Sequence, residues 1–129
     1  MSEYTSTIEG YQRAMESSLA SDPRQWVEAT ALPTFYQIMN GERVDYEAYV
    51  KHIGDMQANT KDYKPIVQQF LRDGDQLAAR VKGSLNMGGT DIEYEAFMFA
   101  KVDKETGKME WLIERAVTSP AGSGTGGAN

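Results

Sequence analysis

Two side chains in this sequence are candidates for moving protons near neutral pH, and the first is a histidine. His52 is the only histidine among the 129 residues, and histidine has the ordinary pKa closest to neutrality. It lies three residues after Tyr49 and four before Met56, so on a helix it would border their apolar stripe. His52 is therefore either a partly exposed helical residue or a general acid/base facing a pocket.

The second candidate lies on the strand expected over residues 108–117, where alternate side chains point to opposite faces. One set is Met109, Trp111, Ile113 and Arg115, and the other is Glu110, Leu112 and Glu114. The first set is more apolar, so we expect it to face the cavity, with Trp111 in the wall and Arg115 as a cation near the mouth. With the opposite orientation, Glu114 becomes the best acid/base candidate, because burial raises the pKa of a carboxyl group.

Aromatic and methionine side chains could surround a flat, hydrophobic ligand. The candidates for contact with it are Tyr11, Tyr36, Tyr49, Met56, Tyr94 and Trp111. Tyrosine hydroxyls can donate hydrogen bonds to a carbonyl oxygen, and methionines provide adaptable apolar surface. The alternative is that each of these residues belongs to the core, with its hydroxyl satisfied inside the protein.

Arg80 could bind a carbonyl or carboxylate oxygen if it faced a cavity. Ala78 and Lys82 share its face of the strand, however, while Leu77 and Val81 belong to the more apolar face. We therefore expect Arg80 to face outward, in an ion pair.

The composition excludes several kinds of site. The chain has no cysteine, hence no disulfide, thiolate nucleophile or cysteine zinc site. A single histidine cannot form a site of several histidine ligands. Gly83, Gly88 and Gly89 follow a strand pattern but open no helix, so they form no phosphate-binding loop. We expect no metal and no cofactor, and the net charge of −6 argues against nucleic acid as a partner.

The first half of the chain must supply helices and a hairpin. The expected elements are helices over residues 4–19, from Pro23 to Pro33 and over 46–60, and strands over 34–39 and 42–44. Asp22 and Asp45 suit the N-caps of the second and third helices. Asn40-Gly41 between the two short strands is the strongest local signal for a β-hairpin.

The second half is typical of an antiparallel meander. Strands are expected over residues 66–72, 76–87, 92–102 and 108–117. Helices followed by neighbouring long strands predict an α+β fold. The third of these strands carries large apolar groups on both faces, so we expect helices to cover one face and a second subunit to cover the other, giving a homodimer.

The ends of the chain carry no targeting pattern. The polar N-terminus has no signal-peptide core, and no apolar run approaches the ~20 residues that span a bilayer, so we expect a cytoplasmic protein with no membrane partner. Residues 1–118 are expected to form one domain, and the Gly/Ser-rich residues 119–129 a flexible tail.

Two stretches of the sequence resemble a known family. Arg72–Gly83 is similar to its acidic Gly-Asp turn followed by an apolar strand with an embedded Arg, and Gly107–Trp111 to the turn that begins its last strand. On these residues the chain resembles the SnoaL-like proteins of the nuclear transport factor 2-like superfamily. The resemblance implies a curved antiparallel sheet wrapped around about three N-terminal helices, enclosing a conical cavity.

The family's acid–base pattern is matched poorly at individual positions. Cyclases of this type carry an Asp near the end of the last strand, where this chain has Val117, and often a His where it has Leu85-Asn86-Met87. We therefore do not carry polyketide-cyclase chemistry over. The function expected is a cofactor-independent isomerase, cyclase or dehydratase that transfers protons on a hydrophobic polyketide- or terpenoid-like intermediate. The alternative is a non-catalytic module of the same fold that binds small molecules or forms a dimeric scaffold.

Overall fold

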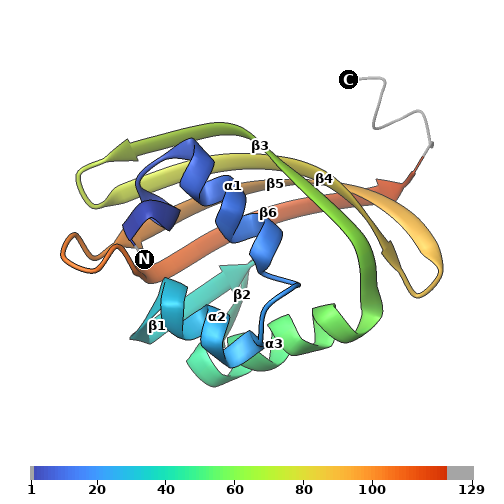
Figure 1. Ribbon diagram of the computed structural model, residues 1–129, viewed down its shortest axis with the longest axis horizontal. Helices are drawn as coiled ribbons and strands as arrows, with labels where there is room; N and C mark the ends of the chain where they lie inside the picture. Colours follow the sequence, from blue (N-terminus) through green and yellow to red (C-terminus); the bar gives the residue numbers. More distant parts are fainter. Residues whose placement is uncertain (1, 122–129) are drawn as a thin grey trace.

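The computed structural model describes residues 2–121, which form three α-helices and one six-stranded sheet. A 3₁₀ turn, Ser2–Thr5, precedes the helices α1 (Ile8–Ser17), α2 (Pro23–Thr30) and α3 (Tyr46–Asn59). The strands are β1 (Ala31–Met39), β2 (Glu42–Asp45), β3 (Thr60–Asp73), β4 (Gln76–Met87), β5 (Thr90–Val102) and β6 (Met109–Pro120). This arrangement confirms the α+β fold with a curved sheet around the helices (Figure 1).

Side-chain caps explain where the helices begin. The Asp22 carboxylate accepts a hydrogen bond from the Gln25 N–H at 3.0 Å, and the Asp45 carboxylate from the Ala48 N–H at 2.9 Å. Both predicted N-caps are therefore confirmed. The first helix is shorter than predicted, because Thr7 caps it instead by accepting from the Gly10 N–H at 3.0 Å.

The strands lie in the order β2-β1-β6-β5-β4-β3. The β1–β6 pair is parallel and every other pair is antiparallel. β3 begins at Thr60, directly after α3, whereas the sequence pattern placed its start beyond Pro65. Proline is tolerated inside this strand because β3 is an edge of the sheet, where one side of the backbone needs no partner.

The helices cover one face of the sheet and the core lies between them. Figure 1 shows α1 across the long strands and α2 and α3 beside β1. Tyr11 and Val27 from the helices meet Leu77, Val81 and Val102 from the sheet in this core, all of them almost completely buried.

Within residues 2–121, no element covers the other face of the sheet. This face, which we call the outer face, exposes large apolar side chains on three strands, namely Ile66, Leu71, Phe97, Phe99, Ile113 and Val117. Arg80 lies on this face with its Nε donating to the Glu95 carboxylate at 2.6 Å. The prediction that Arg80 faces outward in an ion pair is confirmed.

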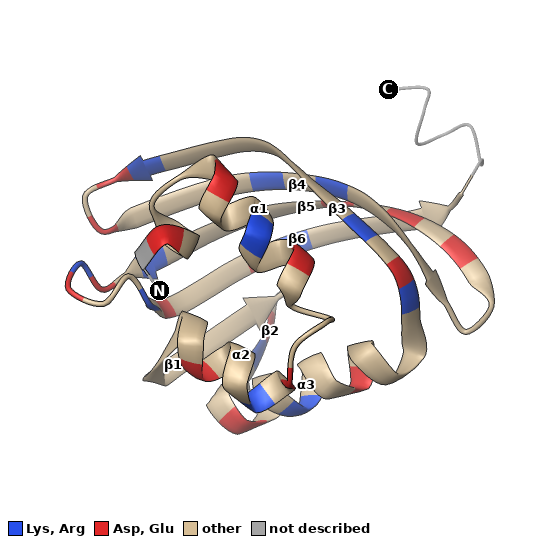
Figure 2. Ribbon diagram, viewed as in Figure 1, with Lys and Arg blue, Asp and Glu red and all other residues tan. Residues whose placement is uncertain are grey.

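Charged residues of both signs are interspersed over the helices and strands (Figure 2). No helix within residues 2–121 combines the length and apolar character needed to cross a bilayer. β6 continues through Ser119 and Pro120, two residues into the predicted tail, and residues 122–129 of that tail lie outside the described part of the chain. The cytoplasmic location stays a prediction.

Candidate active site

A cavity of about 400 Å³ lies between the helices and the sheet. The helices and the turn after α1 contribute Met15, Ser18, Leu19, Trp26, Tyr49, His52, Ile53 and Met56 to its lining. The sheet and its first hairpin contribute Gln37, Met39, Asn40, Tyr63, Leu85, Met87, Ile92, Tyr94, Met98, Leu112, Glu114, Ala116 and Thr118. The volume lies within the ~300–1,000 Å³ typical of ligand pockets, and most of the lining is apolar.

The face of β6 that lines this cavity is the one that carries Glu114. Near the start of the strand, Val102 pairs with Met109 but Lys101 pairs with Trp111, so Glu110 is an extra residue in a β-bulge. The bulge reverses the alternation, because it adds one residue to a period of two. Met109 and Leu112 are consequently both buried on the inner side.

The same bulge corrects the expected orientation of two candidates. Trp111 and Arg115 were predicted to face the cavity with Met109. Both lie on the outer side of β6 and neither lines the cavity. The opposite orientation, which the sequence left open, is the observed one.

Glu114 is the only carboxylate among the described residues that line the cavity. The residue is partly buried in the cavity wall. Burial raises the pKa of Glu114 to about 7, and the hydrogen bond from Gln37 opposes that rise. The Gln37 amide Nε2 donates to Glu114 Oε1 at 3.0 Å. No Lys or Arg among the described residues lines the cavity, so no cation there offsets the effect of burial on Glu114. A carboxyl group with a pKa near 7 therefore faces the ligand space.

The hairpin turn holds the backbone at Glu114 and at Ala116, two residues further along β6. Asn40 and Gly41 have positive φ angles of 50° and 88°, as the predicted Asn-Gly turn requires. The Asn40 N–H donates to the Glu114 carbonyl at 2.8 Å. The Asn40 side chain then accepts from the Ala116 N–H at 2.9 Å and donates to the Ala116 carbonyl at 3.3 Å. Asn40 thereby extends the β1–β6 pairing beyond the end of β1 and fixes the segment that carries the carboxyl.

Three tyrosines of the lining carry hydroxyls that stay protonated. Burial is the main cause that raises the pKa of Tyr49, Tyr63 and Tyr94, and the negative charge of Glu114 adds to it. The Tyr94 hydroxyl donates to the Tyr63 oxygen at 3.1 Å, with the two rings stacked 6.2 Å apart. Neutral phenols of this kind can donate hydrogen bonds to an oxygen that gains negative charge.

Gly83 makes room for one ring of this pair. It lies opposite Tyr94 in the β4–β5 register. A Cβ at this position would lie 2.7 Å from Tyr94 Cε1 and 2.8 Å from the Lys64 carbonyl oxygen. The absence of a side chain therefore allows Tyr94 to lie across β4 toward Tyr63 on β3.

The remaining predicted residues divide between the cavity and other places. His52 and Met56 line the cavity from α3, with His52 exposed. Tyr11 is a core residue whose hydroxyl lies 2.8 Å from the Met98 sulfur. Tyr36 pairs with Trp111 in the β1–β6 register and so shares its outer side, where the Arg43 guanidinium lies 3.7 Å from the ring centroid. Tyr36 is therefore corrected from the cavity to the outer face.

Gln37 and Tyr63 line the cavity but were not among the site residues predicted from the sequence. Gln37 was passed over between Tyr36 and Ile38, although the alternation of a strand puts it opposite to both. Tyr63 lies before Pro65, in a stretch that the sequence pattern left outside any strand. The signal that could have identified Gln37 is that it is the single polar residue within an apolar run.

No protein-family model matches the chain, and no curated protein matches it. Solved structures do. The BvnE pinacolase from Penicillium brevicompactum superposes with a TM-score of 0.72 at 11% identity, covering 84% of this chain and 81% of that one. A SnoaL-like protein from Shewanella denitrificans, named as a proposed polyketide cyclase, gives a TM-score of 0.67 at 8% identity, with 81% and 85% covered. IdmH from Streptomyces antibioticus, also a proposed polyketide cyclase, gives 0.64 at 17% identity, with 81% and 86% covered.

These likenesses concern the fold. The chain has the fold of the SnoaL-like and ketosteroid isomerase-like structures that it matches, so the fold implied by the sequence resemblance is confirmed. In this fold the cavity described above lies between the curved sheet and the helices that it surrounds.

Proposed function

We propose that this chain is an enzyme that transfers protons on an uncharged, hydrophobic small molecule without a cofactor. The reaction class is isomerisation, cyclisation or dehydration, and the substrate class is a polyketide- or terpenoid-like intermediate. The observation that carries the proposal is Glu114, a carboxyl inside an apolar cavity whose pKa lies near 7. A group that titrates close to the working pH can both accept and return a proton.

The mechanism uses groups that already face the cavity. The Glu114 carboxylate takes a proton from a carbon beside a carbonyl group of the substrate. The electron pair moves onto the carbonyl oxygen, which accepts a hydrogen bond from the hydroxyl of Tyr49 or Tyr63. The protonated Glu114 then returns the proton to carbon at a second position, or to a leaving hydroxyl. His52 at the exposed side of the cavity is the second candidate for a proton carrier.

Similar folds support the class of reaction. The structures reported above include a pinacolase and proposed polyketide cyclases. The apolar cavity of about 400 Å³ suits hydrophobic small molecules, and the lack of Lys or Arg in its described lining disfavours anionic substrates.

Deuterium exchange at the acidic carbon of 2-tetralone in D₂O, followed by proton NMR, tests the proposal without knowledge of the natural substrate. The native chain should accelerate the exchange, and Glu114→Gln should lose about 100-fold or more of that acceleration. His52→Gln measures the second candidate. Glu110→Gln is the matched control, since Glu110 lies on the same strand outside the cavity and pairs with Lys101 at 3.3 Å. No acceleration by the native chain, or full activity of Glu114→Gln, contradicts the proposal.

A second candidate is a binding module without catalysis. Val117 and Leu85-Asn86-Met87 stand where cyclases of the resembled type carry Asp and His, which favours it. Binding of 2-tetralone without any exchange above the buffer rate would select this function.

We further propose that the outer face pairs with a second copy of this chain. Its exposed apolar residues lie on neighbouring strands, and Phe99 pairs directly with Ala78 and Ile113 in the sheet register. The ion pair Arg80–Glu95 on the same face supplies both signs of charge, so the surface can be complementary to itself in a two-fold dimer.

A further inference from the structure

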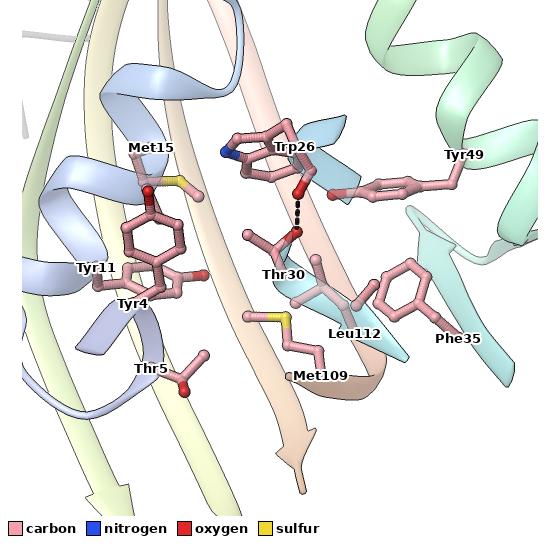
Figure 3. Close-up of a pocket in the computed structure, with 12 residues that line it drawn as sticks. Tyr4, Thr5, Tyr11, Met15, Trp26, Thr30, Phe35, Tyr49, Met109 and Leu112 are labelled. Carbon is pink, nitrogen blue, oxygen red and sulfur yellow. Dashed lines mark hydrogen bonds between the residues drawn. The ribbon is translucent and has the colours of Figure 1, made fainter. Parts of the chain in front are cut away.

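A second, smaller cavity of about 30 Å³ shares part of its lining with the main one. Figure 3 shows the residues around this smaller cavity. Met15, Trp26, Tyr49 and Leu112 line both cavities and form the wall between them. We call the smaller cavity the inner chamber. Ala14 and Ala31 line the inner chamber but not the main cavity. Their short side chains leave space that larger residues would fill.

Three of the hydroxyls around the inner chamber already donate to partners inside the protein. The Thr30 hydroxyl donates to the Trp26 carbonyl at 2.9 Å, shown by the dashed line in Figure 3. The Thr5 hydroxyl donates to the Gly107 carbonyl at 2.6 Å, and the Tyr11 hydroxyl lies 2.8 Å from the Met98 sulfur. No acidic or basic side chain of the described residues lines this space. Such a cavity favours an apolar occupant over water, which needs two or more polar partners.

Met15 is the part of the dividing wall that can move most easily. The Trp26 indole N–H donates to the Ser17 hydroxyl at 3.1 Å, and the Tyr49 ring packs on Phe35 with centroids 4.8 Å apart. Met15 is only partly buried, and its unbranched side chain has three rotatable bonds. A change of rotamer at Met15 would join the two cavities without disturbing the anchored rings.

We propose that the inner chamber is a subsite for a short, unbranched alkyl group of the ligand, entered past Met15. A single water needs about 10–15 Å³ on the same measure, so the chamber has room for roughly two carbons beyond the wall. Together with the proposed function, on which the carbonyl part rests, this narrows the substrate class to hydrophobic carbonyl compounds with a short alkyl chain.

The test is calorimetric binding of a homologous series of phenyl ketones, from acetophenone to hexanophenone. In the native chain, each methylene that enters the chamber should raise the affinity about fourfold, and the rise should stop once the chamber is full. Ala31→Leu fills the chamber and should abolish the rise while acetophenone binds within about twofold of the native affinity. Ala116→Leu is the matched control, because Ala116 lines the main cavity alone and this variant should weaken all members by one common factor.

Two further variants keep the result decisive. Ala14→Leu fills the same chamber from α1 and replaces Ala31→Leu if circular dichroism shows that the latter does not fold. Met15→Ala removes part of the wall and should move the end of the rise to longer chains. The subsite is overturned if no ketone binds, if affinity does not depend on chain length, or if the filled variants keep the native dependence.

The series is repeated in Glu114→Gln, so that this inference and the proposed function fail separately. If Glu114→Gln keeps the dependence of ketone affinity on chain length and also keeps the native rate of proton exchange, the role of Glu114 is rejected and the subsite is supported. If Glu114→Gln loses proton exchange but ketone affinity in the native chain does not depend on chain length, the subsite alone is rejected.

Discussion

Glu114 is a carboxyl group whose surroundings favour its neutral form. Burial withdraws water from the charged form, and within the described lining no Lys or Arg offsets that loss. The Gln37 amide supplies one donor, which is weaker compensation than a cation. The result is a pKa close to 7 in a group that would otherwise titrate near 4.5.

This shift makes the stability of the fold depend on Glu114. Because the folded pKa is raised, the folded state binds the proton more tightly than the unfolded state does, and that contribution is complete below about pH 4.5. It is lost as the pH rises through about 7, at a cost of up to about 3 kcal/mol. Glu114→Gln should therefore stabilise the protein at pH 8 relative to the native chain and have little effect at pH 4.5. Urea unfolding at the two pH values measures this, and an equal effect at both would contradict it.

Gln37 should set the pH at which the carboxylate forms. Its hydrogen bond lowers the pKa of Glu114, so Gln37→Met should raise that pKa. The exchange rate, which needs the carboxylate, should then rise at higher pH than in the native chain. The measurement is the pH profile of 2-tetralone exchange from pH 5 to 9, with Gln69→Met on the edge strand as control. A change in rate at every pH without a shift of the profile would indicate a purely structural role for Gln37.

At the scale of elements, β6 shows what the sequence pattern can and cannot predict. The strand itself was predicted to within a few residues at each end, because its apolar alternation is local. Its orientation was not, because the bulge at Glu110 depends on pairing with Lys101 and Val102 of another strand. The same bulge moves Arg115 outward and Glu114 inward. Tyr63 was missed for a related reason, since its strand is an edge that tolerates Pro65.

The β4–β5 pair offers a test of how the sheet positions the tyrosines. Gly83→Ala should push the Tyr94 ring away and break its hydrogen bond to Tyr63, because the new Cβ would meet Tyr94 Cε1 at 2.7 Å. The expected cost is about 1–3 kcal/mol of stability, with weaker ketone binding. Gly54→Ala on α3 controls for the loss of a glycine, since its φ is not positive and the new Cβ would meet only Pro23 Cγ, at an ordinary contact distance of 3.7 Å. Unchanged ketone affinity and an unchanged Tyr94 ring environment by NMR would contradict this account.

At the scale of the whole molecule, the order of elements was the strongest signal. Capped helices, an Asn-Gly hairpin and long strands with tight turns are each specified by local residues, and together they predicted the α+β fold. The cavity depends instead on how the sheet curves around the helices. Distant residues such as Gln37 and Glu114 meet there only after β1 and β6 pair in parallel, which no local pattern reveals.

The outer face is where the whole molecule makes a further prediction. Phe99 lies on the outer face and is 63% exposed. A charge at this position should disrupt a dimer that forms through the outer face. Phe99→Asp should weaken self-association by at least about tenfold, measured by sedimentation velocity. Ile8→Asp, an exposed apolar residue on α1, is the control and should associate as the native chain does. A native chain that stays monomeric at all concentrations would exclude the dimer.

The most direct test of the central claim is the titration of Glu114 itself. Carboxyl carbon NMR of the protein labelled at glutamate, with Glu114→Gln to assign the resonance, reports its protonation between pH 3 and 9. The structure predicts a midpoint near 7 for Glu114, and a shift of that midpoint when a ketone fills the cavity. A midpoint near 4.5, unaffected by the ketone, would contradict the claim that this cavity holds a buried acid/base group.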